Sequence, residues 1–127
     1  MALTSGSVTL KASGGTYSTW AGFWDDLGNL TGDITCTVDA GAYTETTAPA
    51  AVTETLGGYT LTVTAATFPS TTDATTGPMF TWNATGFFLN MQMEGAGAVT
   101  IEGIVYITGT GSQGYSPYYF YQIDTSF

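Results

Sequence analysis

The chain has 127 residues, with ten carboxylate side chains, one cation, no histidine and a formal net charge of -9 at pH 7. This is the length of one domain with its own core, and a hydrophobic fraction of 43% excludes a disordered chain. Because Lys11 is the only cation, the chain has no basic patch that could hold a phosphate backbone. Nucleic-acid binding is therefore excluded, and binding to an anionic membrane surface is disfavoured.

The first thirty residues predict one strand and then the only helix of the chain. Residues 7–12 alternate between apolar and polar side chains, which is typical of a strand. Apolar residues then recur at helical spacing and must be buried on one face: Trp20, Phe23, Trp24 and Leu27. We expect Ser18 or Thr19 to cap the N-terminus of this helix, and residues 28–29 to end it after two to three turns.

From residue 33 the apolar period changes to two, which predicts strands for most of the remaining chain. The first of them points Ile34, Cys36 and Val38 inward, and residues 39–41 then turn the chain. Residues 44–55 are a polar connection with a short strand at Val52. The cleanest strand covers residues 59–64, with Tyr59, Leu61 and Val63 inward.

The second half continues the same pattern of short strands and glycine turns. Residues 69–78 and 109–114 are expected to be loops, because both are rich in glycine or in proline, serine and threonine. Strands are expected at residues 79–82, 87–94, 99–102, 104–107 and 118–123. In the second of these, Phe87, Leu89, Met91 and Met93 share one face.

The spacing of the strands suggests how they are arranged. Strands centred near Cys36, Leu61 and Leu89 recur at intervals of about 25 to 28 residues, the period of a solenoid. We therefore expect a single all-β domain, a short right-handed parallel β-helix. Residues 1–30 would form an N-terminal strand and capping helix, residues 31–110 the β coils, and residues 111–127 an aromatic tail. An antiparallel β-sandwich or jelly roll satisfies the same alternation.

The start of the helix also carries a family resemblance. Residues 14–20, Gly-Gly-Thr-Tyr-Ser-Thr-Trp, with the aromatic and acidic helix after them, resemble the N-terminal cap of phage and metagenomic right-handed parallel β-helix virion proteins. Residues 97–105 look like a coil of the same family, and the resemblance covers roughly residues 5–110. Residues 115–127 depart from it because they are more aromatic than an ordinary coil. The resemblance implies a helix that caps the first coil.

The residue types leave little room for catalysis. Without histidine there is no Ser-His-Asp or Cys-His machinery, and a single lysine cannot supply the cationic groups of β-helix polysaccharide lyases. Carboxylate-dependent glycoside hydrolysis is the remaining option. Asp25 and Asp26 are neighbours and point in different directions on a helix, whereas Glu94 and Glu102 could approach around a turn. We expect solvated carboxylates at strand ends and no catalytic residue.

The same types argue against a metal site or a cofactor. Calcium loops collect six to eight oxygen ligands in a compact segment, but Asp33 and Asp39 flank a strand and Asp73 is solitary. Cys36 is the only cysteine, so no intramolecular disulfide can form, and we expect an inert core thiol. Residues 1–7 have neither the basic nor the apolar region of a secretory signal, so we expect none, although the composition resembles that of an extracellular surface protein. Both features favour a protein made in a host cytoplasm that works in a virion.

The last thirteen residues are crowded with aromatic side chains, and one strand can hide only alternate residues. The tail could cap its own last coil, form a subunit or capsid interface, or stack on sugars. We expect the interface, made by Tyr115, Tyr118, Tyr119, Tyr121 and Phe127.

These observations together predict a non-enzymatic structural protein of a phage virion. It would be a capsid decoration or cement protein, or part of a fibre or spike. It would self-associate, with a homotrimer preferred, and contact other virion proteins such as the major capsid protein. The alternatives are a carbohydrate-binding or adhesin module whose partner is a glycan and, less favoured, a carboxylate-dependent glycosidase.

Overall fold

The computed structural model describes residues 2–69, 77–108 and 118–123, with side chains described for residues 2–69 and 77–106. The described residues are mostly strand, with one short helix, so the expected all-β class is confirmed. The elements are β1 (Gly6–Leu10), α1 (Trp20–Asp25), β2 (Ile34–Val38), β3 (Gly41–Glu45), β4 (Thr60–Ala65), β5 (Pro78–Trp82), β6 (Leu89–Glu94), β7 (Ala98–Glu102), β8 (Val105–Thr108) and β9 (Tyr118–Ile123).

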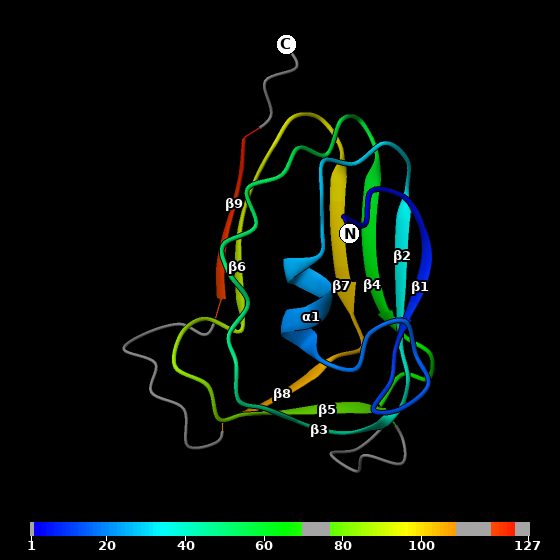
Figure 1. The fold of residues 1–127 in the computed structure, drawn as a ribbon, viewed down its shortest axis with the longest axis vertical. Helices are drawn as coiled ribbons and strands as arrows, with labels where there is room; N and C mark the ends of the chain where they lie inside the picture. The colour runs from blue at the N-terminus through cyan, green and yellow to red at the C-terminus, as the bar shows by residue number, and fades with distance from the viewer. Residues whose placement is uncertain (1, 70–76, 109–117, 124–127) are drawn as a thin grey trace.

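The strands form three sheets with the orders β1-β2-β4-β7, β3-β5-β8 and β6-β9. Every strand pair among the described residues is parallel. The antiparallel sandwich expected as an alternative is therefore wrong, because its strands would pair in opposite directions. Figure 1 shows the three sheets on different sides of the molecule.

The chain visits the sheets in a fixed order, first through β4, β5 and β6 and then through β7, β8 and β9. Cys36 of β2 pairs with Val63 of β4, and Val63 pairs with Ile101 of β7. The strand around Leu89 was expected to continue the repeat of the strands around Cys36 and Leu61. This expectation is wrong, because Leu89 lies in β6, which belongs to another sheet. The step from residue 63 to residue 101 is longer than the step from residue 36 to residue 63 because residues 66–77 separate β4 from β5, whereas only residues 39–40 separate β2 from β3.

The core consists of the inward residues of these strands. Ile34, Cys36 and Val38 are fully buried, and so are Leu61 and Val63, as the alternation predicts. Leu89, Met91 and Met93 of β6 are buried as well.

Three details of the expected strands are wrong. Tyr59 precedes β4 and is 37% exposed rather than inward. Phe88 rather than Phe87 is buried, because β6 begins only at Leu89 and its alternation does not extend back to these residues. The segment after residue 41 is the strand β3 rather than a turn and connection, and its partner is β5.

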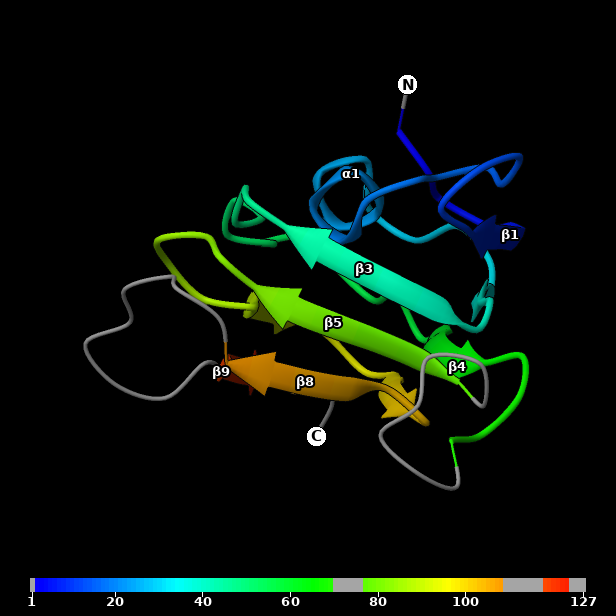
Figure 2. The same cartoon turned by 90° about the horizontal axis from the view of Figure 1, so that it is seen from below.

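Helix α1 lies at one end of the stacked strands. Figure 2 shows α1 near β1, with β3, β5 and β8 following in that order toward the opposite end. The hydroxyl of Thr19 accepts a hydrogen bond from the Gly22 backbone N–H at 3.0 Å, so Thr19 is the N-cap, one of the two expected residues.

The expected end of the helix is wrong, because α1 has six residues and its C-cap is Asp26. Gly28 instead allows a close approach of the N-terminal segment: its N–H donates to Leu3 O at 2.9 Å, and a Cβ at Gly28 would lie 2.9 Å from the Cβ of Ala2.

Candidate functional site

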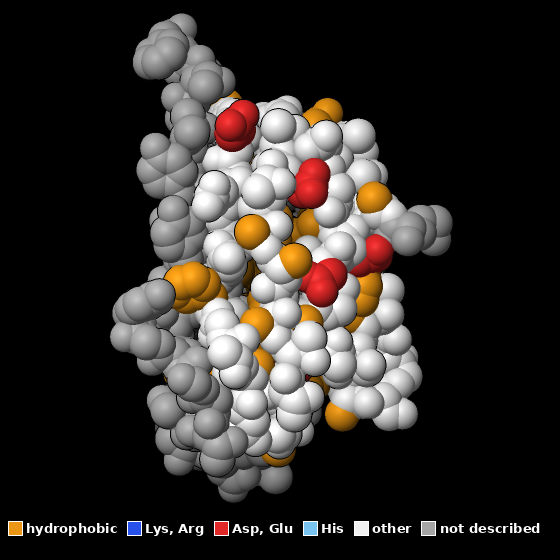
Figure 3. All heavy atoms as spheres, turned by 60° about the vertical axis from the view of Figure 1, so that its left-hand side comes forward, with side chains coloured by type: hydrophobic (Ala, Val, Ile, Leu, Met, Phe, Trp, Pro, Cys, Tyr) orange, Lys and Arg blue, Asp and Glu red, His pale blue; other side chains and the backbone are white. Residues whose placement is uncertain are grey.

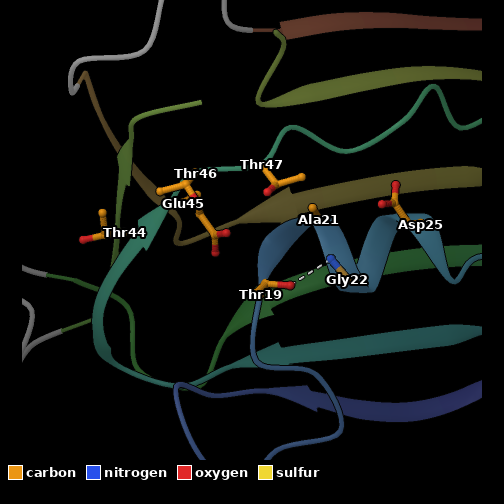
Figure 4. Close-up of a pocket in the computed structure, with 8 residues that line it drawn as sticks. All are labelled: Thr19, Ala21, Gly22, Asp25, Thr44, Glu45, Thr46 and Thr47. Carbon is orange, nitrogen blue, oxygen red and sulfur yellow. Dashed lines mark hydrogen bonds between the residues drawn. The ribbon is translucent and has the colours of Figure 1, made fainter. Parts of the chain in front are cut away.

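A partly open pocket of about 300 Å³ lies between α1 and the end of β3. Figure 4 shows its lining, which combines two carboxylates with four threonine hydroxyls. The lining residues are Thr19, Ala21, Gly22, Asp25, Thr44, Glu45, Thr46 and Thr47. Among the described residues, no other class of ionisable side chain lines this pocket.

Glu45 is the most unusual residue of the pocket, because it is only 4% exposed although it is acidic. The alternation of β3 places it inward together with Tyr43. The backbone N–H of Trp20 donates to Oε1 of Glu45 at 2.9 Å. Burial raises the pKa of the Glu45 carboxyl, and the hydrogen bond from Trp20 opposes that rise.

This contact gives Glu45 a structural role. The first N–H groups of a helix have no partner within the helix, and a buried N–H without a partner costs free energy. Glu45 satisfies the Trp20 N–H, and Thr19 satisfies that of Gly22. Thr19 caps the helix from its own segment, whereas Glu45 joins the start of α1 to β3.

The second carboxylate of the pocket, Asp25, is also bonded to backbone. Its Oδ1 accepts a hydrogen bond from the Ala50 N–H at 2.8 Å, which ties the segment after β3 to the helix. Each of the two carboxylates therefore accepts a hydrogen bond from a backbone N–H, and the two bonds connect α1 to β3 and to the segment that follows β3.

The sequence did not identify Glu45 as a site residue, although a signal was present. Residues 41–45 alternate with Tyr43 and Glu45 in the same phase, and Tyr43 is a natural core residue. An acidic residue in the inward phase of a strand indicates a buried, hydrogen-bonded carboxylate.

The carboxylates considered from the sequence do not form a catalytic pair. Glu94 ends β6 and Glu102 ends β7, in two different sheets, and both side chains are exposed. Glu102 accepts a hydrogen bond from the Thr64 hydroxyl at 3.1 Å.

Asp25 and Asp26 point to different partners, as predicted for neighbours on a helix. Asp25 accepts from the Ala50 N–H, whereas Asp26 accepts from the Tyr17 hydroxyl at 2.5 Å. The pKa of the Tyr17 hydroxyl is raised well above its usual value. Burial is the larger cause, and the hydrogen bond to the Asp26 carboxylate is the next.

The four residues predicted to form the buried face of the helix are all buried: Trp20, Phe23, Trp24 and Leu27. Trp20 connects α1 to a strand far away in the sequence. Its ring stacks on Phe88 with centroids 4.3 Å apart, and its Nε1–H donates to Phe88 O at 2.5 Å. Trp20 also contacts Phe80 of β5, with centroids 5.0 Å apart. Helix α1 therefore covers one end of the stacked strands and also places the Trp20 side chain in the core between them.

The residues of the expected aromatic interface are only partly placed. Tyr118, Tyr119 and Tyr121 belong to β9, whose backbone pairs with β6 in parallel register. Their side chains lie outside the described set, as do Tyr115 and Phe127 entirely. The interface therefore stays a prediction.

The described residues provide no grouping for a metal ion. Within them, no three His, Cys, Asp or Glu side chains lie together in a way that could hold one. On the face seen in Figure 3, acidic side chains are spread out rather than gathered, and no basic side chain is visible. Asp73 lies outside the described residues. In the described part of the chain no helix is long and apolar enough to cross a membrane.

Comparison of the chain with protein-family models, with curated proteins and with solved structures finds no match.

Proposed function

We propose that this chain is a non-enzymatic structural protein of a phage virion, built as a short right-handed parallel β-helix. The parallel pairing of all described strands supports this fold, as does the repeated order in which the chain visits the three sheets. Crossovers between parallel strands of one sheet are almost always right-handed, which supports the handedness. Decoration proteins, fibres and spikes are the virion components that such a module would suit.

The observation that carries the proposal is the difference between the two ends of the stacked strands. At the first end, α1 covers the interior. At the other end the same inward rows are less well covered: Leu61, Val63 and Phe80 are fully buried, whereas their in-register neighbours Val99, Ile101 and Tyr106 are partly exposed. These partly exposed apolar residues lie on β7 and β8, the last strands of their sheets in the described part of the chain, and such a surface favours association with another protein.

The partner that we propose is first a copy of this chain, in a homotrimer, and then a virion protein such as the major capsid protein. The chain would act in the virion after synthesis in the host cytoplasm. A net charge of -9 keeps it from binding nucleic acid within the particle, so its contacts are with protein.

Light scattering coupled to size-exclusion chromatography tests the self-association. We expect the mass of a trimer at micromolar concentration, and Ile101→Thr to shift the protein toward monomer because it removes apolar area at the open end. Ala42→Thr is the control, since Ala42 is an exposed residue of β3, at the end of the stacked strands that α1 covers. A monomeric wild-type protein would refute the trimer. The virion assignment itself is tested by the gene neighbourhood, which should contain capsid, portal or tail genes.

A further inference from the structure

The β1-β2-β4-β7 sheet lies at the right of Figure 1. Residues on its outer face fall into two rows, and all but one of them carry a hydroxyl group. The parallel register places equivalent residues of the four strands side by side. The first row is Ser7, Thr35, Thr62 and Thr100, and the second is Thr9, Thr37, Thr64 and Glu102. We call these eight residues the threonine face.

The spacing within this face is set by the backbone. Neighbouring strands lie roughly 4.8 Å apart, and every second residue along a strand is about 6.7 Å further on, so the side chains form a nearly rectangular grid. Threonine is β-branched and stiff at χ1, which keeps hydroxyls and methyl groups in fixed positions. Beneath the grid, Cys36 and Val63 are fully buried and hold the two central strands against the core.

The charge on this face is unusually low for so acidic a chain. Seven of the eight residues are uncharged, and the exception, Glu102, lies at the end of its row, where it accepts from Thr64. Lys11 follows β1 and pairs with Asp39 at 3.5 Å, outside the grid. A charged lattice or polymer therefore has no complementary groups here, whereas a neutral, hydrogen-bonding lattice does.

We propose that the threonine face binds ice, holding an ordered layer of water that matches the crystal surface. Oxygen atoms on the prism face of hexagonal ice also repeat on a rectangular grid of similar dimensions. A threonine hydroxyl can donate and accept, as water does, and its methyl group orders the water around it. Within this face the Thr9 hydroxyl already accepts from the Thr16 N–H at 3.2 Å, and the Thr64 hydroxyl donates to Glu102. A crystalline polysaccharide is the rival occupant, but no aromatic side chain stands in either row to stack on sugars.

Partition of the full-length protein into slowly growing ice tests this inference. We expect the protein to be enriched in the ice fraction and to slow ice recrystallisation. Thr62→Lys should abolish both effects, because it places a bulky charge at the centre of the grid. Gln92→Lys is the matched control, with the same charge on an exposed position of β6, and it should retain both effects.

A milder variant, Thr35→Leu, guards against loss of folding, and circular dichroism verifies the fold of each protein. Exclusion of the folded wild-type protein from ice would refute the inference. So would equal ice activity of the wild type and a folded Thr62→Lys, or binding to microcrystalline cellulose without binding to ice. None of these results depends on the oligomeric state or on a virion location.

Discussion

Trp20 and Trp24 are one helical turn apart and equally buried, but they differ in one hydrogen bond. Trp20 Nε1 donates to Phe88 O, whereas Trp24 Nε1 has no partner among the described residues. Replacing either tryptophan by phenylalanine removes a similar volume from the core. The difference between the two variants therefore reports the value of the hydrogen bond.

We expect Trp20→Phe to lower the free energy of unfolding by about 1–3 kcal/mol more than Trp24→Phe. The first variant deprives a buried carbonyl of its donor, while the second removes a buried N–H that lacks a partner. Urea denaturation followed by far-UV circular dichroism measures both losses. Equal losses, or a larger loss in Trp24→Phe, would show that the Trp20 bond contributes little.

At the scale of the element, Glu45 connects β3 to α1, and its buried carboxyl makes the free energy of unfolding depend on pH. Burial raises the pKa of this carboxyl above its ordinary value of 4.5, so the folded state binds the proton more tightly than the unfolded state. The contribution of Glu45 to stability is therefore fully present below about pH 4.5, and it is lost as the pH rises through the folded pKa.

Glu45→Gln removes this dependence but keeps an oxygen that can accept from the Trp20 N–H. We expect the melting temperature of the variant, relative to that of the wild type, to increase between pH 4 and pH 7. Thermal melts across that range measure the difference, and Glu94→Gln serves as an exposed control. A constant difference across the pH range would mean that the burial of Glu45 does not perturb its titration.

The elements differ in how far the sequence predicts them. The alternation of residues 34–38 predicts β2 correctly because one face of that strand packs on the core and the other does not. The alternation fails at the strand ends, where Tyr59 and Phe88 take positions set by the turns. Strand β3 is missed because its outward residues are small or polar, and its assignment depends on pairing with β5.

The candidate site is harder to predict, for a related reason. The burial of Glu45 depends on α1 lying across the end of β3, a contact between residues 25 positions apart. No local pattern encodes that contact. The helix face itself could be predicted, since the spacing of Trp20, Phe23 and Trp24 depends only on helical geometry.

At the scale of the whole molecule, the strands of each sheet are joined by contacts between residues far apart in the sequence. Cys36 lies at the centre of this arrangement, in β2 between β1 and β4, and it is fully buried. Burial raises the pKa of its thiol to about 12. Since only the thiolate reacts with disulfide reagents, Cys36 is both inaccessible and chemically inert in the folded protein.

We therefore expect a disulfide reagent such as Ellman's reagent to label Cys36 only when the molecule unfolds as a whole. The labelling rate at pH 8 should be negligible in buffer and should rise with urea in parallel with the loss of far-UV signal. The denatured chain, labelled at once, provides the reference rate. Rapid labelling in buffer would mean that β1 separates locally from β2, and that the stacked strands do not unfold as one cooperative unit.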